Sequence, residues 1–442
     1  MQSRTANRSN LRFLSNQSLK KIVVQGVNVN SLLSMNDLGL KKPVQKEIVF
    51  GVLRFFFFLE TCLSRHLNRD LKNKHMDIKL LILMGVYEVK FMRTPAHAAI
   101  NQTVEVCHQL GKAWAKGLVN AVLRKIAASE TILENIEEDL PVWLSKKLEL
   151  DFPEHCQMIK KAFLKKPEMA LRINRCKISP EDYKVKLEKA AISFRTSPFE
   201  EAIILNHAKP SRDLPGWLNG EFSVQDLGAI TLGNFFFTRI NESKENKVKL
   251  LDVCSAPGGK LFHLTELLAF HKITSSITAL EISQQRIKTM IDSGKRLGHR
   301  VPVLAGDASK DHWWDRTTFT HILVDAPCSS SGTIRRNPDI KLLLKETSLP
   351  FFQKNQLDIL TNLWNKLRKG GLMFYSTCSL FKEENDLLIS EFLNKEEDAE
   401  LLNLKVPEGV TNALATDYGC NLLPFDKISD GFYCSLISKK TT

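Results

Sequence analysis

Residues Leu250–Lys260, Leu-Leu-Asp-Val-Cys-Ser-Ala-Pro-Gly-Gly-Lys, join a short apolar segment to an amphipathic one. The first segment, Val248–Val253, predicts a β-strand, and leucines at positions 261, 264, 267 and 268 predict a helix. The strand end supplies the carboxylate of Asp252, the glycines let the main chain approach a ligand, and the helix start offers unpaired N–H groups. A strand, a glycine turn and a helix N-terminus in this order predict a binding site for a nucleotide-like ligand.

The same alternation of strand and helix continues from Asn246 towards the C-terminus. It predicts a doubly wound, mostly parallel α/β sheet. The predicted strands are Val248–Val253, Ser276–Leu280, Val301–Leu304, His321–Val324 and Leu372–Tyr375, with helices that include Gln284–Leu297 and Ser348–Arg368. Gly431–Ile437 alternates apolar and polar residues and predicts an antiparallel strand at the sheet edge.

Acidic residues follow two of these predicted strands, where the strands of such a sheet open onto one crevice. Glu281 ends the second strand, about twenty residues past the glycine turn, where an acid typically binds ribose hydroxyls. Its alternatives are a helix N-cap or a surface acid. Asp307 follows the third strand, and it either binds the adenine end of a ligand or caps a turn.

Two cysteines are predicted to reach the same crevice. Asp325-Ala-Pro-Cys328 follows the fourth strand, and Ser376-Thr-Cys378-Ser follows the fifth. A thiol pair suits pyrimidine chemistry, because carbon 5 becomes nucleophilic only after a thiolate has added to carbon 6. One cysteine would attack, the second would assist release, and Asp325 would stabilise charge at ring nitrogen 3. Either cysteine could be the nucleophile, and the base would have to be flipped out or single-stranded.

Residues 1–140 predict a basic, all-helical domain. These residues include 20 Lys and Arg and 12 Asp and Glu, which gives a net charge of +8 out of +13 for the whole chain. This charge predicts an RNA-docking module, with a solvated surface that binds nothing as the alternative. The predicted helices are Leu11–Val29, Pro43–Leu67, Ile78–Phe91, Ala96–Leu110 and Ala113–Ile126.

An acidic stretch, Glu134–Leu140, precedes Pro141 and predicts a domain boundary. Beyond it, a small α+β linking domain is expected at residues 141–235, followed by the α/β domain at 236–442. The elements predicted in the linking domain are helices Leu144–Leu164 and Pro180–Ala190, a strand at Ala170–Asn174, and short strands and turns in residues 194–226.

Nine scattered cysteines, none in a Cys-x-x-Cys pair, predict neither a metal site nor a disulfide framework. Cys62, Cys107, Cys156 and Cys176 are expected to be small buried hydrophobes. Met1–Lys21 lacks an apolar signal core, and the apolar run Ile48–Leu59 is too short to span a bilayer. We expect a cytoplasmic monomer that does not bind a membrane.

The motifs Asp-Val-Cys-Ser-Ala-Pro-Gly-Gly-Lys, Asp-Ala-Pro-Cys-Ser and Ser-Thr-Cys-Ser together resemble those of the S-adenosylmethionine-dependent RNA cytosine-5 methyltransferases. Within that superfamily the chain looks like the bacterial 16S ribosomal RNA enzymes of the Sun/Fmu type. The resemblance covers nearly the whole chain. Further matching segments are Phe50–Arg54, Arg93–Ala99, Lys116–Arg124, Leu171–Arg175 and Ile334–Lys341.

The resemblance implies an N-terminal domain like the antitermination factor NusB, a linking domain, and a Rossmann-like class I methyltransferase domain. It implies that Cys378 is the nucleophile, that Cys328 assists product release, and that Lys260 approaches the reaction centre. The implied cofactor is S-adenosylmethionine, with no metal. The residues implied to bind it are Cys254, Ser255, Ala256, Pro257, Gly258, Gly259, Lys260, Glu281, Asp307 and Asp325.

The implied reaction is methylation of carbon 5 of a cytosine in 16S ribosomal RNA, at position 967 in bacterial numbering. The alternatives are the same chemistry on transfer RNA or 23S ribosomal RNA, and an RNA-binding assembly factor that is not an enzyme. We also predict that Arg335 and Arg336 contact RNA phosphates near the crevice.

Overall fold

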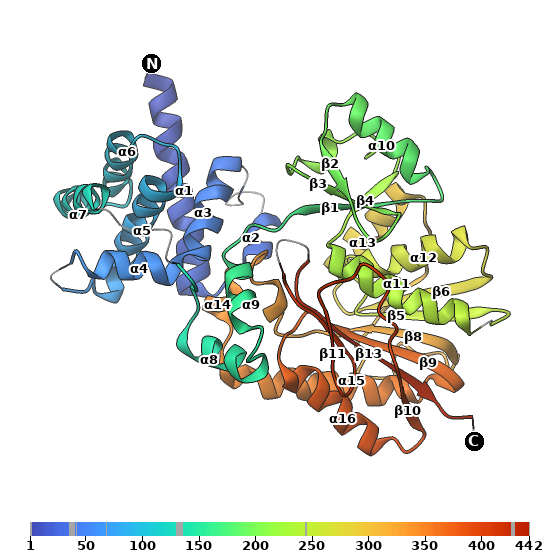
Figure 1. Ribbon diagram of the computed structural model, residues 1–442. Coiled ribbons are helices and arrows are strands. Elements are labelled where there is room, and N and C mark those ends of the chain that lie inside the picture. The colour runs from blue at the N-terminus through green and yellow to red at the C-terminus, as the bar shows by residue number, and fades with distance from the viewer. Residues whose placement is uncertain are drawn as a thin grey trace. The chain divides into compact units, whose positions relative to one another are not determined.

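The computed structural model describes residues 2–34, 40, 42–67, 69–129, 136–243, 245–425 and 429–441. The chain forms two compact units. Unit 1 comprises Met1–Lys165 together with Ile334–Leu344, and unit 2 comprises Lys166–Thr333 together with Lys345–Thr442. Figure 1 colours the chain by residue number, so that the late segment of unit 1 is recognised by its orange colour and the label α14.

Unit 1 is helical, which confirms the all-α prediction for the N-terminal part. Its centre is α5, in which every residue from 80 to 88 is buried. A helix that is apolar on all sides must be surrounded, and α1, α3, α4, α6 and α7 pack against it. The helices are α1 Gln2–Gln25, α2 Val29–Ser34, α3 Pro43–Arg54, α4 Phe56–Ser64, α5 Met76–Phe91, α6 Ala96–Gln109, α7 Lys116–Ala128, α8 Val142–Asp151, α9 Cys156–Phe163 and α14 Ile340–Leu343.

Two helices that we expected to be continuous are each broken. The predicted helix Pro43–Leu67 is interrupted at Phe55 (φ −113°, ψ 29°), whose ring stacks on Phe91 at 4.4 Å. Leu144–Leu164 divides after Asp151, because Pro153 lacks an N–H and cannot continue the helical ladder. Residues 134 and 135 of the predicted boundary lie outside the described residues.

Unit 2 begins with a small α+β layer. Its antiparallel sheet has the strand order β2-β3-β1-β4, and α10 (Pro180–Lys189) accompanies it. Leu171, Ile203 and Phe222 contribute to its core. The strands are β1 Met169–Ile173, β2 Phe194–Thr196, β3 Ala202–Leu205 and β4 Phe222–Val224.

The second sheet of unit 2 is the predicted α/β sheet, with strand order β11-β12-β13-β9-β8-β5-β6-β7 and β10 paired to β13. Strands β7, β6, β5, β8 and β9 are parallel. The strand order reverses at β5 and β8, which places a topological switch point there. The strands are β5 Val248–Val253, β6 Ser275–Glu281, β7 Val303–Ala305, β8 Phe319–Asp325, β9 Leu367–Thr377, β10 Ala399–Leu402, β11 Ala413–Ala415, β12 Cys420–Leu422 and β13 Phe432–Lys439.

Helices pack against this sheet, and one helix and one strand differ from the sequence-based expectation. Helix α11 runs through residues 235 and 236, where the linking domain was predicted to end. Strand β13 is antiparallel to β9 as predicted, but it is not an edge strand, because it also pairs with β12 and β10. The helices are α11 Leu227–Glu242, α12 Gly259–Phe270, α13 Gln284–Leu297, α15 Leu349–Trp364 and α16 Asp386–Lys395.

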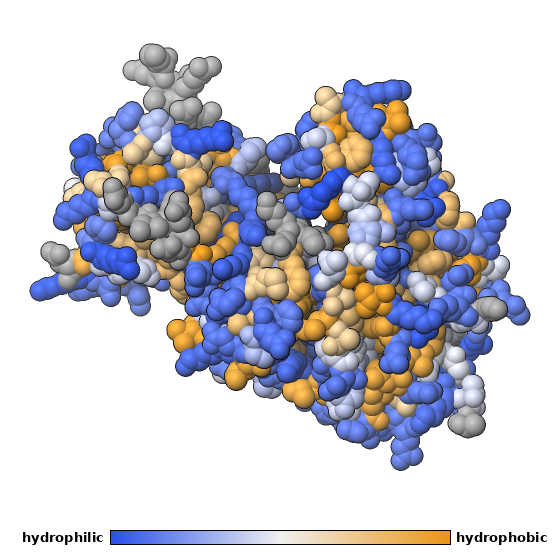
Figure 2. Space-filling view, in the orientation of Figure 1, coloured by the Kyte–Doolittle hydropathy of each residue, from blue (hydrophilic) through white to orange (hydrophobic). Residues whose placement is uncertain are grey.

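The apolar run at residues 48–59 falls in α3 and α4, and Ile48, Val52 and Leu59 are buried in the core of unit 1. Figure 2 shows hydrophilic residues over much of the visible surface of both units. Within the part of the chain that the structure describes, no helix is long and apolar enough to cross a membrane.

Candidate active site

The turn between β5 and α12 has the conformation that its sequence predicts. Gly258 has φ 95°, in the left-handed region, and a Cβ there would lie 2.4 Å from the ring of Phe262. Gly259 begins α12. Within 4 Å of a Cβ built on Gly259, the nearest atoms belong to the side-chain amide of Gln225 alone. The main chain of this turn is therefore open on the side where a ligand would approach.

The carboxylates of Asp252 and Glu281 hold the turn in place by accepting hydrogen bonds from it. Ser255 Oγ donates to Asp252 Oδ2 at 2.8 Å, and the Ala256 N–H donates to Glu281 Oε2 at 3.2 Å. Both carboxylates are buried, and burial raises the pKa of Asp252 to about 7. Glu281 thus joins the end of β6 to the glycine turn.

A pocket of about 180 Å³ opens beside this turn. Cys254, Glu281, Asp307 and Pro327 contribute to its lining. Asp307 also caps its own turn, because its Oδ1 accepts hydrogen bonds from the Ser309 N–H at 2.9 Å and from Ser309 Oγ at 2.8 Å. Burial, and then the charge of nearby carboxylates, raises the pKa of Cys254, so that this thiol stays protonated.

The open glycine turn and the acidic pocket fit a nucleoside attached to a short polar chain. Carboxylates suit ribose hydroxyls, and the start of α12 suits an anionic group. A larger cavity of about 450 Å³ lies between α12 and α13, but none of the predicted site residues lines it. Among the described residues, no group of three or more His, Cys, Asp or Glu is placed to hold a metal.

Cys328 and Cys378 meet beyond the ends of β8 and β9, with their sulfur atoms 3.4 Å apart. The loops that carry them are joined, because the Gly332 N–H donates to the Cys378 carbonyl at 2.9 Å. Both side chains are half-buried, and Cys378 Sγ also lies 3.4 Å from Ser330 Oγ. The prediction that parallel strand ends would bring the two thiols together is in accord with this geometry.

The two sulfurs are electrostatically unequal. The hydrogen bond from Cys328, with further help from Ser330 and the charge of Lys260, lowers the pKa of Cys378 despite its burial. The same contact, and then burial, raises the pKa of Cys328 well above its usual value. Either sulfur could donate by position alone. The charge of Asp325 raises the pKa of Cys378 and that of Lys260 lowers it, so the hydrogen bonds at this sulfur, rather than the ion pair, favour a thiolate at Cys378.

Lys260 and Asp325 form an ion pair beside the cysteines, with Nζ and Oδ1 separated by 2.8 Å. The Lys260 side chain is 10% exposed, whereas that of Asp325 is 35% exposed. Burial alone would lower the pKa of Lys260, but the charge and hydrogen bond of Asp325 raise it overall. Lys260 consequently stays cationic next to the thiol pair.

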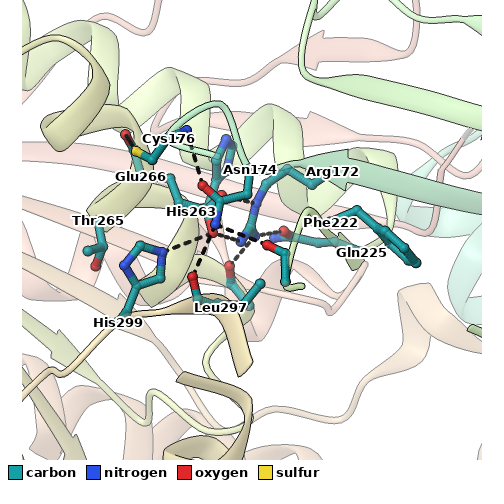
Figure 3. Close-up of polar contacts among 12 residues, drawn as sticks. Arg172, Asn174, Cys176, Phe222, Gln225, His263, Thr265, Glu266, Leu297 and His299 are labelled. Atoms are coloured by element: carbon teal, nitrogen blue, oxygen red, sulfur yellow. Dashed lines mark hydrogen bonds and ion pairs between the residues drawn. The ribbon is translucent and has the colours of Figure 1, made fainter. Parts of the chain in front are cut away.

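Arg172 of β1, within the matching segment Leu171–Arg175, is the centre of a buried polar cluster (Figure 3). The sequence alone predicted no role for this cluster. The guanidinium of Arg172 donates to both carboxylate oxygens of Glu266, at 3.0 and 3.1 Å. It also donates to the Gly259 carbonyl at 2.7 Å and to Gln225 Oε1. The small sheet of unit 2 thus holds the first turn of α12, and only the long-range contacts reveal it.

Two expectations about individual side chains are wrong. Arg335 is 1% exposed and belongs to unit 1, where its carbonyl accepts from Arg54 Nη2 at 2.6 Å, so its guanidinium is not on the surface to meet phosphates. Arg336 is half-buried. Cys176 is exposed rather than buried, and its thiol donates to the Glu266 carbonyl at 3.5 Å. All nine cysteines are free.

Comparisons with known proteins agree with this architecture. Residues 239–438 match a family model described as 16S rRNA methyltransferase RsmB/F. Residues 12–128 match the NusB family, and residues 140–212 match the ferredoxin-like domain of RsmF/B-like methyltransferases. Ribosomal RNA small subunit methyltransferase B from several Escherichia coli strains is 33% identical over 442 residues, covering 98% of this chain and 99% of the relative.

Solved structures show the same fold. That of PH0851 has a TM-score of 0.77 at 20% identity and covers 98% of this chain and 99% of its own. NSun6 from Pyrococcus horikoshii, solved with SFG, has a TM-score of 0.58 at 18% identity and covers 70% of this chain and all of its own.

Proposed function

Given that the chain belongs to the RsmB/F family of S-adenosylmethionine-dependent 16S rRNA methyltransferases, we propose that it methylates carbon 5 of a cytosine in 16S ribosomal RNA. We place the target at position 967 in bacterial numbering, as the family resemblance implies. The observation that carries the proposal is the 3.4 Å contact between Cys328 and Cys378, in which one thiol is acidified and the other is kept protonated.

In this proposal the Cys378 thiolate adds to carbon 6 of a flipped cytosine, which makes carbon 5 nucleophilic. The Lys260–Asp325 pair stabilises the charge that develops at ring nitrogen 3. After methyl transfer a base takes the proton from carbon 5, the carbon 5–carbon 6 double bond forms again, and the carbon 6–sulfur bond breaks to return the Cys378 thiolate. Cys328 donates its S–H to that sulfur, so the contact that favours the thiolate before attack also stabilises it as it leaves. We therefore assign attack to Cys378 and product release to Cys328.

S-adenosylmethionine, when bound, supplies the methyl group as an electrophile. The residues to which we assign its binding are those of the open turn and the adjoining pocket. Their chemistry fits, because main-chain N–H groups at the α12 start suit its carboxylate and Glu281 suits ribose hydroxyls. They are Cys254, Ser255, Ala256, Pro257, Gly258, Gly259, Lys260, Glu281, Asp307 and Asp325.

We further propose that residues 1–140 dock the RNA, because the net charge of +8 there favours a polyanion. The division at 141–235 and 236–442 remains part of this proposal, with α11 crossing the second boundary.

The test is direct identification of the product. The protein would be incubated with methyl-labelled S-adenosylmethionine and unmodified 16S ribosomal RNA, and the RNA digested for mass spectrometry. We expect labelled 5-methylcytosine, which bisulfite sequencing would locate at a single site. Label in another nucleoside would contradict the assigned chemistry. Label in 5-methylcytosine of transfer RNA or 23S ribosomal RNA instead would contradict the assigned substrate.

A further inference from the structure

Glu384 is a buried carboxylate to which the mechanism above gives no role. It ends a short 3-10 turn, Lys382–Glu384, just beyond the Cys378 loop, and it is 0% exposed. Among the described residues it has no ion-pair partner, and burial raises the pKa of its carboxyl. Burying a carboxyl group without a cation is unfavourable unless its hydrogen bonds are well satisfied.

The hydrogen bonds of Glu384 connect the two cysteine loops. From the Cys328 loop, the Ser329 N–H donates to Oε1 at 2.8 Å, and Ser329 Oγ donates to Oε2. From the other loop, Ser379 Oγ donates to the same Oε2. The carboxylate of Glu384 thus accepts hydrogen bonds from Ser329 and from Ser379, the residues that directly follow the two cysteines.

A third element completes the arrangement. Gln356 of α15 donates from Nε2 both to Glu384 Oε1, at 3.0 Å, and to the Pro327 carbonyl, at 2.9 Å. The hydroxyls of Ser329 and Ser379 lie 3.1 Å apart, each within reach of Glu384 Oε2. The carboxylate therefore accepts from both loops and from the helix that supports one of them.

This geometry bears directly on the thiol pair. The contact between Cys328 Sγ and Cys378 Sγ depends on how the two loops are placed, since each sulfur belongs to a different strand end. A hydrogen bond of 3.4 Å between sulfurs is lost if either loop moves outwards by about 1 Å. Glu384 restrains both loops through the residues adjacent to the sulfurs.

We propose that Glu384 is a positioning residue that holds Cys328 and Cys378 at hydrogen-bonding distance by accepting hydrogen bonds from Ser329 and Ser379. This inference rests on the proposed function, in which Cys378 attacks and Cys328 donates to it. It gives Glu384, which follows the Ser-Thr-Cys-Ser motif, a role in keeping the Cys378 thiol next to Cys328.

The proposal is tested on the full chain without RNA, by the pH dependence of iodoacetamide alkylation at Cys378, read by peptide mass spectrometry. Glu384→Gln keeps the shape but has one acceptor oxygen and adds an amide donor facing two hydroxyls. We expect its alkylation profile to shift to higher pH by about one unit, which slows alkylation near neutral pH about tenfold. The matched control is Glu391→Gln on α16, where the glutamate pairs with Lys395 and accepts from Gln353. The control should keep the wild-type profile.

A merely structural role would lower the melting temperature without moving this profile. Unchanged profiles in a folded Glu384→Gln protein would therefore overturn the proposal. Ser379→Ala removes a single donor and serves if Glu384→Gln does not fold. We expect a smaller shift in the same direction, and an unchanged profile there would equally overturn it.

A second readout separates this inference from the proposed function. Covalent RNA adducts would be compared in Cys328→Ala and Cys328→Ala/Glu384→Gln proteins incubated with S-adenosylmethionine and 16S ribosomal RNA. Because Cys328→Ala already removes the sulfur–sulfur contact, we expect equal rates of adduct formation in the two variants. Slower adduct formation in the double variant would show that Glu384 acts on Cys378 by another route, which contradicts the proposal. No adduct in Cys328→Ala itself would contradict the proposed chemistry, while the alkylation profile would still decide the role of Glu384.

Discussion

Lys260 Nζ lies 2.8 Å from Asp325 Oδ1, so that the first turn of α12 is joined to the end of β8. One residue follows the glycine turn assigned to the cofactor, and the other precedes Cys328 by three positions. A single ion pair therefore links the proposed cofactor site with the proposed reaction centre, and both of its charges act on Cys378.

Removing this ion pair should reduce catalysis more than cofactor binding. We expect Lys260→Met to lower the single-turnover rate of methyl transfer by about 100-fold, because a positioned charge at the reacting base is lost. The affinity for S-adenosylhomocysteine, measured by calorimetry, should change by less than about tenfold. Equal losses in both quantities would mean that Lys260 serves cofactor binding alone.

The contact of Arg172 with Glu266 and Gly259 predicts a stability effect far from the cysteines. Arg172→Met leaves Glu266 buried without its main partner, and we expect a loss of about 3–5 kcal/mol in the free energy of unfolding. S-adenosylhomocysteine should also bind more weakly, because the Gly259 carbonyl loses its donor.

The control for Arg172 is Arg195→Met on β2, where the arginine pairs with Glu168 near the surface. That change should reduce the free energy of unfolding by less than about 1 kcal/mol. Similar losses for the two variants in urea titrations would contradict a special role for the buried cluster.

Lys341 of the late segment of unit 1 should stabilise that unit rather than bind RNA. Its ammonium is buried against Asp139, whose carboxylate accepts from the N–H groups of Phe57 and Phe58 at the start of α4. Lys341→Met leaves a buried carboxylate unpaired, and we expect a loss of about 3–5 kcal/mol. Amide hydrogen exchange in α4 should become at least about 100-fold faster.

The control for Lys341 is Lys125→Met in α7, where the side chain is exposed. Its exchange rates should stay at wild-type values. The double change Lys341→Met/Asp139→Leu should recover much of the loss, because no buried charge then remains. A double variant as unstable as Lys341→Met would show that the ion pair is not the cause.

His321 on β8 predicts a pH-dependent stability. Burial lowers its pKa from 6.5 to about 4, with Arg368 contributing in the same direction. The unfolded chain therefore takes up the proton first, and stability present above pH 6.5 is lost as the pH falls towards 4. Between pH 7.5 and 5 this group should account for a loss of about 2 kcal/mol.

The measurement for His321 is urea unfolding at pH 7.5 and pH 5. In His321→Leu the difference between the two pH values should shrink by about 2 kcal/mol. A variant with the same pH dependence as the wild type would locate the effect in other groups.

The site was predictable where local sequence dictates it. The glycine turn at Gly258 and the strand ends that carry Cys328 and Cys378 follow from alternating periodicity and from the geometry of parallel sheets. Arg172 and Glu384 were not predictable, because a charged side chain is normally exposed, and only contacts distant in sequence reveal that it is buried. The prediction that Arg335 contacts RNA failed for the same reason. Adjacent arginines favour a surface assignment, yet its main chain bonds to Arg54.

The pairing of β13 with β12 and β10 could likewise not be predicted from the periodicity of apolar residues. An alternating pattern indicates a strand but not its number of neighbours, and β12 and β11 have only three residues each. The domain organisation was easier to predict from the sequence, because the basic helical part and the α/β part differ in the spacing of their apolar residues as well as in charge.

Two single-cysteine variants test most directly whether Cys378 is the sulfur that attacks the base. Cys328→Ala and Cys378→Ala proteins would each be incubated with S-adenosylmethionine and 16S ribosomal RNA and run on a denaturing gel. Because Cys378 forms the bond and Cys328 assists its release, a covalent protein–RNA band should accumulate with Cys328→Ala and be absent with Cys378→Ala. A band with Cys378→Ala and none with Cys328→Ala would contradict the assignment, and methyl transfer by both variants without a band would contradict covalent catalysis itself.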